Sequence, residues 1–155
     1  MTPRNDKAQQ IAALPVCSDV NGKLRVLMVT SRDTGRWVMP KGWLMDGEKP
    51  WRAAEIEALE EAGATGFISH HAIGTYSYSK RLDDGSKLHC TVTIYPMFVQ
   101  KLRLRWKERH ERKRHWFSLK KAAKLVNEKE LSDILLKIAG DPDHLTIVQE
   151  LRQAS

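Results

Sequence analysis

The 155-residue sequence has only two cysteines, Cys17 and Cys90, and their spacing matches no metal site. Both lie in apolar segments, which predicts buried free thiols in a reducing compartment. No apolar run approaches the roughly 20 residues of a membrane-spanning helix. The first ten residues, MTPRNDKAQQ, lack the apolar core of a signal peptide. Together these absences predict a cytoplasmic protein that has no membrane partner.

The sequence also shows no internal repeat and no linker, which predicts a single domain over residues 1–155 with a flexible start at 1–8. Its hydrophobic content of 41% is that of a globular protein with a real core. The net charge of +7 favours an anionic partner. Nucleic acid, polyphosphate and an acidic surface all satisfy this requirement.

Hydrophobic patterning predicts strands around one central helix, followed by further helices. Strands are expected near residues 10–15, 24–30, 37–39, 72–79, 88–100 and 115–119, and helices near 50–62, 120–126 and 129–139. A last helix could cover 143–152. The segment Leu24 to Thr30 is apolar throughout, so it should be buried on both faces, and Tyr95-Pro96 could mark an edge or a bulge. This order suits an α+β fold or a mixed-sheet α/β sandwich.

The most informative feature is a group of three carboxylates, Glu57, Glu60 and Glu61, at positions i, i+3 and i+4. On a helix this spacing places all three on one face. Such like-charged pairs cost an isolated helix about 0.2–0.5 kcal/mol each. A hard divalent cation removes this cost, because Mg²⁺ prefers oxygen ligands. The alternative is an acidic helix face that is simply solvated.

The flanks of this helix carry turn and capping residues at a specific spacing. Gly42 and Gly47 predict a flexible loop, Pro50 suits the first helical turn, and Gly63 can close the C-terminus. The pattern formed by Gly42, Glu48, Glu57, Glu60-Glu61 and Gly63 resembles the Nudix box. That box marks a superfamily of Mg²⁺- or Mn²⁺-dependent hydrolases of nucleoside diphosphates linked to another group. The resemblance implies a mixed β-sheet sandwiched between helices.

The resemblance also implies roles for individual residues. Metal would be held by Glu57, Glu60 and Glu61 with a backbone carbonyl near Lys41 or Gly42. The general base would be a glutamate of the box or of a later loop, with Glu57 first and Glu111 or Glu108 in reserve. One position departs from the box, since Ile56 stands where an arginine usually helps to hold the catalytic glutamates. This departure predicts weakened catalysis.

A second charged feature is the segment Lys101 to His115, with eight lysines or arginines and two acids. As a strand, its start would display Lys101, Arg103 and Arg105 on one side, which is also typical of a solvated strand edge. Arginines form bidentate pairs with phosphate, so the later part of the segment is a candidate polyanion site. A nucleic-acid patch would look the same.

Further pieces of the sequence resemble one branch of the Nudix superfamily, the diphosphoinositol polyphosphate and diadenosine polyphosphate hydrolases. These pieces are Pro40-Lys41-Gly42 and the pair Trp116-Phe117 followed by Ala122. We therefore expect a small-molecule polyphosphate substrate, cleaved at a phosphoanhydride bond. Its charge would be met by Arg36, Lys41, Arg109, Arg112 and Arg114, and Trp43 could stack on a base. A ligand sensor without turnover and an RNA-binding or RNA 5′-end-processing protein are the alternatives, and the sequence leaves the oligomeric state open.

Overall fold

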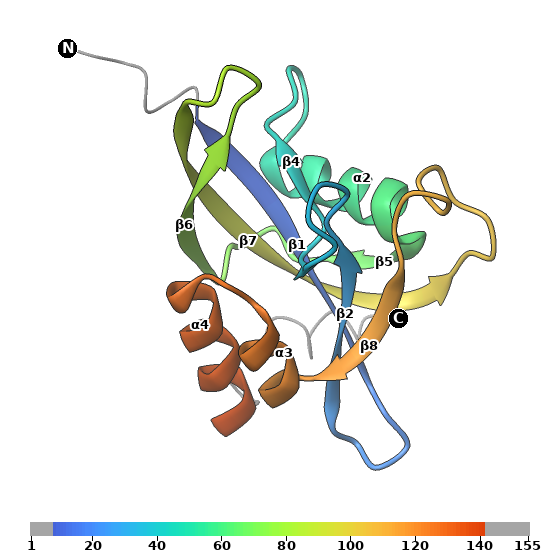
Figure 1. Cartoon of the computed structure of the whole chain (residues 1–155). Coiled ribbons are helices and arrows are strands. Elements are labelled where there is room, and N and C mark those ends of the chain that lie inside the picture. Colours follow the sequence, from blue (N-terminus) through green and yellow to red (C-terminus); the bar gives the residue numbers. More distant parts are fainter. Residues whose placement is uncertain (1–7, 142–155) are drawn as a thin grey trace.

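A computed structural model of the chain describes residues 8–141, in which a mixed sheet lies between helices (Figure 1). The strands are β1 (Gln9–Ser18), β2 (Leu24–Thr30), β3 (Trp37–Val38), β4 (Lys41–Trp43), β5 (Ala64–Ile68), β6 (Gly74–Arg81), β7 (Lys87–Leu102) and β8 (Arg114–Ser118). The helices are α2 (Pro50–Ala62), α3 (Leu119–Leu125) and α4 (Lys129–Gly140). The predicted α/β sandwich is confirmed.

The centre of the sheet is β1, which pairs with three other strands. It runs parallel to β7 and antiparallel to both β2 and β4. The main path through the eight-stranded sheet is β3-β2-β1-β7-β5, while β8 pairs with β2 and β6 with β7. One end of β1 thus lies beside β4, the strand that leads into the loop before α2.

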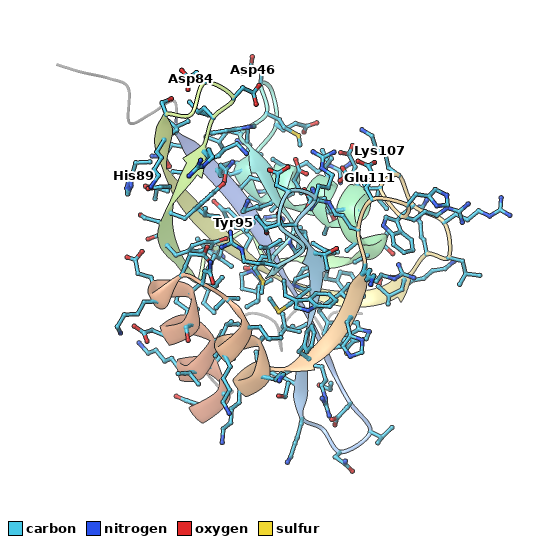
Figure 2. The ribbon with its side chains drawn as sticks, in the orientation of Figure 1. Asp46, Asp84, His89, Tyr95, Lys107 and Glu111 are labelled. Carbon is cyan, nitrogen blue, oxygen red and sulfur yellow. The ribbon has the colours of Figure 1, made fainter. Side chains whose placement is uncertain are left out.

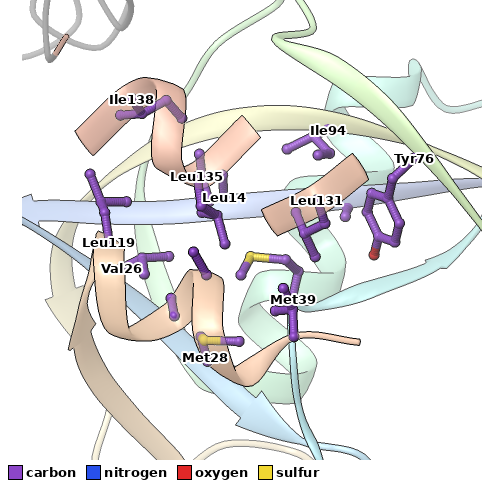
Figure 3. Close-up of a cluster of buried hydrophobic side chains, with 14 of the residues drawn as sticks. Leu14, Val26, Met28, Met39, Tyr76, Ile94, Leu119, Leu131, Leu135 and Ile138 are labelled. Carbon is purple, nitrogen blue, oxygen red and sulfur yellow. The ribbon is translucent and has the colours of Figure 1, made fainter. Parts of the chain in front are cut away.

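The two faces of the sheet carry separate hydrophobic cores, as the alternation of side chains along β1 requires. Ala12 and Leu14 lie in the core beneath α3 and α4 (Figure 3). Ile11 and Ala13 lie in the other core, beneath α2. Because α2 packs with alanines at positions 53, 54, 58 and 62, its axis can approach the sheet closely. This close approach places the carboxylates of α2 beside β4.

Several predicted boundaries agree with the structure. The segment 24–30 is β2, with Val26 to Val29 buried, and the helix predicted at 50–62 is α2. It begins with Pro50 and ends at Gly63, whose φ of 65° is left-handed. Pro96 lies where β7 changes its antiparallel partner from β6 to β5, and its carbonyl accepts from the Ser69 N–H at 2.8 Å. A missing donor is tolerated at such a junction.

Other expectations were wrong or fall outside the described residues. The short strands β4 and β5 were not predicted. Cys90 is buried as expected, but Cys17 is partly exposed, and both thiols are free. The segments 1–7 and 143–152 lie outside the described residues. Within 8–141, no helix has the length and apolar character needed to cross a membrane.

Candidate active site

The site begins where α2 packs against β4. A Cβ atom added to Gly42 would overlap the carboxylate of Glu57, so glycine here leaves room for this carboxylate against the strand. The backbone N–H of Lys41 lies 3.4 Å from Glu61 Oε1. Glu57 and Glu61, four residues apart on α2, therefore sit together at the strand that enters the loop.

Burial makes this carboxylate pair electrostatically costly. Glu61 is only 5% exposed, and burial raises its pKa to about 8, with Glu57 and Glu108 adding to the effect and Arg112 opposing it. Burial also raises the pKa of Glu57, and the charges of Glu60 and Glu108 add to it. The buried carboxylate of Glu61 and the half-buried one of Glu57 fit a hard divalent cation, which would offset this cost.

The predicted group of three glutamates is not assembled around one point. Glu60 turns away from the pair, and its Oε1 lies 3.6 Å from the Lys107 Nζ. Among residues 8–141, no group of three or more histidine, cysteine, aspartate or glutamate side chains has the geometry of a metal site. The residues present thus offer two converged carboxylates, with Glu60 one helical turn from Glu57.

The carbonyl groups at the end of α2 are bound by a segment that comes much later in the chain. We call residues 103–114 the capping segment; it runs from the end of β7 into β8. A helix leaves its last four carbonyls without intrahelical partners. Here four donors of the capping segment bind such carbonyls at 2.8–3.1 Å. The backbone N–H of Glu108 donates to the Glu60 carbonyl and that of Arg103 to the Gly63 carbonyl. The Trp106 indole donates to the Glu61 carbonyl and the Arg114 guanidinium to the Ala62 carbonyl.

This arrangement corrects the expectation of a strand through Arg105. β7 ends at Leu102, so Lys101, Arg103 and Arg105 do not form one row of a strand. The pattern of alternating leucines suggested a strand, but Leu104 is 88% exposed and packs in neither core. The helix end, and not the sheet, sets the conformation of this stretch.

Two of the predicted phosphate ligands are occupied by protein groups. Arg114 stacks on Trp106, with 3.8 Å from its guanidinium carbon to the ring centroid, and burial lowers its pKa. Arg112 Nε donates to Glu108 Oε1 at 2.7 Å, and its Nη1 donates to the Thr30 carbonyl at 3.0 Å. Its Nη2 lies 3.6 Å from Glu61 Oε2. Both guanidinium groups therefore hold the structure together.

A hollow of about 390 Å³ opens beside Arg112, between the end of β2 and the capping segment. It is lined by Thr30, Ser31, Arg32, Gly35 and residues 109–113. Arg109 and Lys113 are exposed there, and Arg36 is exposed next to the lining residue Gly35. Arg112 separates this basic hollow from the buried carboxylates, so a bound anion would lie close to them.

The two reserve bases differ in position. Glu111 lies on the rim of the hollow, where it pairs with Arg32 at 2.9 Å; its side chain is labelled in Figure 2. Glu108 is more enclosed, and its charge raises the pKa of both Glu57 and Glu61. Glu108 is therefore the better placed of the two. Sequence reasoning missed Trp106, for which no motif or spacing gave a signal.

Lys41 has a different environment from the other candidate ligands. It pairs in register with Ala12, so its side chain lies on the face of α3 and α4, opposite the carboxylates. Its Nζ lies 3.2 Å from the Tyr78 hydroxyl, which in turn donates to Gln10 Oε1 at 2.7 Å. Burial lowers the pKa of Lys41. The backbone N–H of Lys41 thus faces Glu61, while its side chain contacts Tyr78 on the opposite face of the sheet.

Comparison with known proteins places this geometry in context. The model of the NUDIX domain family matches residues 8–137. A protein of Arabidopsis thaliana named Nudix hydrolase 12, mitochondrial, is 34% identical over 138 residues, which cover 85% of this chain and 68% of that protein. The human diphosphoinositol polyphosphate phosphohydrolase 3-beta is 30% identical over 103 residues, or 65% of this chain and 58% of its own.

Solved structures agree on the fold. The crystal structure of a C. elegans Ap4A hydrolase superimposes with a TM-score of 0.61 at 21% sequence identity. The superposition covers 86% of this chain and 96% of that one. At this identity the likeness concerns the fold alone.

Proposed function

The chain belongs to the NUDIX domain family and is a Nudix hydrolase, and we propose that it cleaves phosphoanhydride bonds in nucleoside or inositol polyphosphates. The observation that carries this proposal is the pair formed by the buried Glu61 and the half-buried Glu57, beside a basic hollow. One part offers oxygen ligands for a cation, and the other offers positive charge for a polyanion. A phosphoanhydride substrate needs both.

We propose that Mg²⁺ or Mn²⁺ is the cofactor and that Glu57 and Glu61 hold it. Glu60 would join them by leaving Lys107, a contact at 3.6 Å between partly exposed side chains that is worth little. The backbone carbonyl of Gly42 is a further candidate, since this residue touches Glu57. A bound divalent ion supplies Lewis-acid polarisation of a phosphoryl oxygen and a lower pKa for bound water.

The proton of the attacking water needs an acceptor within hydrogen-bond reach. Glu57 is the first candidate for the general base, because burial raises its pKa and its carboxylate lies against Gly42 of β4. Glu108 is the reserve in preference to Glu111, because it is the more enclosed of the two and its charge raises the pKa of both Glu57 and Glu61. Arg112 and Arg114 do not serve as phosphate ligands in this proposal, because their donors are engaged by the protein.

The substrate phosphates are assigned to the exposed cations of the hollow, Arg109 and Lys113, with Arg36 beside them. Several arginines and lysines together suit a chain of phosphates better than a diphosphate. The name of one relative, a diphosphoinositol polyphosphate phosphohydrolase, supports this class of substrate. Trp43, the last residue of β4 and 39% exposed, is available to stack on a base.

The test is a screen of Mg²⁺-dependent phosphate release over diadenosine polyphosphates, diphosphoinositol polyphosphates, ADP-ribose and nucleoside triphosphates. Wild-type protein is compared with Glu57→Gln, and with Asp46→Asn as an exposed control on the loop before α2. We expect turnover of a polyphosphate that Glu57→Gln abolishes and Asp46→Asn retains. Tight ligand binding without turnover would favour the sensor function that Ile56 suggests.

A further inference from the structure

The countercharge for the carboxylate pair does not come from its own helix. Arg52 is the one basic residue of α2, and it pairs with Glu55 on the exposed side. The position before Glu57 is Ile56, which is half-buried and has no charge. Within the described residues, the one salt bridge to the pair is that between Arg112 and Glu61.

The guanidinium of Arg112 is fixed on three sides by three different parts of the fold. It contacts Glu61 on α2, the Thr30 carbonyl at the end of β2, and Glu108 within the capping segment. Its side chain is only 10% exposed. Two of its nitrogens are fixed by hydrogen bonds, Nε to Glu108 and Nη1 to Thr30, so the planar group has a defined orientation and directs Nη2 at Glu61, 3.6 Å away. It therefore fixes its partners as well.

We propose that Arg112 is a positioning residue that holds the Glu61 carboxylate at the angle the cation site needs. The inference rests on the proposed function, because it assigns Glu61 to that site. The capping segment reinforces the effect, since Trp106 and Glu108 bind the backbone carbonyls of Glu61 and Glu60 themselves. Side chain and backbone of Glu61 are thus both anchored by the same stretch.

Three roles for Arg112 predict different outcomes. If Arg112 were a phosphate ligand, its loss would raise KM, and more so for substrates that carry more phosphates. If it acted only as a positive charge that opposes the cation, its loss would tighten Mn²⁺ binding. If it positions Glu61, its loss would weaken Mn²⁺ binding, because a misdirected Glu61 binds the ion less well. Groups that orient metal ligands typically contribute about 10–100-fold to affinity or activity.

The experiment compares Arg112→Gln, Arg112→Lys and, as a matched control in the same segment, Arg105→Gln. Arg105 is exposed, and no described residue pairs with it. Free Mn²⁺ is measured by electron paramagnetic resonance without substrate, and kcat and KM are measured separately. We expect Arg112→Gln to weaken Mn²⁺ binding and to lower kcat by about tenfold or more, with KM nearly unchanged. Arg112→Lys should fall between, and Arg105→Gln should match wild type.

Tighter Mn²⁺ binding in Arg112→Gln, or a rise confined to KM, would overturn the inference. Melting temperatures in EDTA provide a test that needs neither metal nor turnover. The effects of Arg112→Gln and Glu61→Gln should be non-additive, as expected for side chains in contact. Additive effects would refute the contact. A wild type that neither binds Mn²⁺ nor turns over, yet shows non-additive melting, would remove the proposed function and leave the anchoring of Glu61 intact.

Discussion

Replacing Glu61 by glutamine should stabilise the metal-free protein at alkaline pH while removing its activity. In the unfolded chain, Glu61 ionises near its ordinary pKa of 4.5, whereas in the fold its pKa is about 8. Between these values the folded state holds a proton that the unfolded state has lost. The free energy of unfolding therefore falls as pH rises through this window, and levels off above pH 8.

The size of this effect follows from the two pKa values. Each unit of difference corresponds to about 1.36 kcal/mol, so the change from 4.5 to about 8 gives at most about 5 kcal/mol. Glu57 takes up part of the titration, because the two carboxyl groups interact. A measured loss of roughly 2–5 kcal/mol between pH 5 and pH 9 is therefore expected for wild type.

The assay is chemical denaturation in EDTA at a series of pH values, with Glu60→Gln as the control. Glu60 lies on the same helix but at the exposed contact with Lys107. Glu61→Gln should flatten most of the pH dependence and exceed wild type in stability at pH 8, whereas Glu60→Gln should keep most of the wild-type slope, since the charge of Glu60 acts on Glu57 and not on Glu61. Saturating Mg²⁺ should restore stability to wild type at pH 8, by about 2.7 kcal/mol at 100 times the dissociation constant. A pH-independent wild type, or a less stable Glu61→Gln at pH 8, would refute the assignment of a destabilised buried carboxylate.

Three further predictions concern the neighbours of this pair. Gly42→Ala should displace the Glu57 carboxylate and lower kcat by about 10²-fold with the fold retained; wild-type kcat would contradict the close packing. In Ile56→Arg the new guanidinium should reach Glu60 at i+4, and turnover should change by less than about tenfold, since Arg112 already pairs with Glu61; kcat and the melting temperature of this variant test the prediction. Joint replacement of Arg109 and Lys113 by glutamine should raise KM more for substrates with more phosphates and less at high salt, because the Debye length is about 8 Å at physiological ionic strength; equal effects on ADP-ribose and a diadenosine polyphosphate would refute it.

The parts of the fold that the sequence predicts well are those fixed by local physics. β2 has a continuous apolar run, and α2 has proline and glycine at its two ends, so both boundaries were predicted correctly. β4 and β5 were missed because short strands of this kind acquire their conformation from partners far along the chain. β5 is held by β7, with a register irregularity between Thr65 and Gly66. No local pattern encodes such a pairing.

The candidate site follows the same division. The spacing of Glu57 and Glu61 is enough to place them together on one helix, and Gly42 lies against Glu57 in the structure, while its role as a metal ligand stays a prediction. The turn of Glu60 toward Lys107 and the engagement of Arg112 were not predictable, because both depend on the path of the capping segment. Composition alone treats Arg109 and Arg112 as equivalent. Only their partners distinguish a cation that faces solvent from one that is held by carboxylates.

The capping segment links the integrity of α2 to the geometry of the site. Its inward side chains, Trp106, Arg112 and Arg114, bind the end of the helix, while Arg109 and Lys113 on the same stretch face the hollow. A change that displaces the segment would therefore remove both the hydrogen bond from Trp106 to the Glu61 carbonyl and the ion pair between Arg112 and the Glu61 carboxylate. A helix with arginine at position 56 would carry part of that countercharge itself. With Ile56 in this place, the countercharge of Glu61 comes from a distant segment, and an anion bound in the hollow would lie directly against that segment.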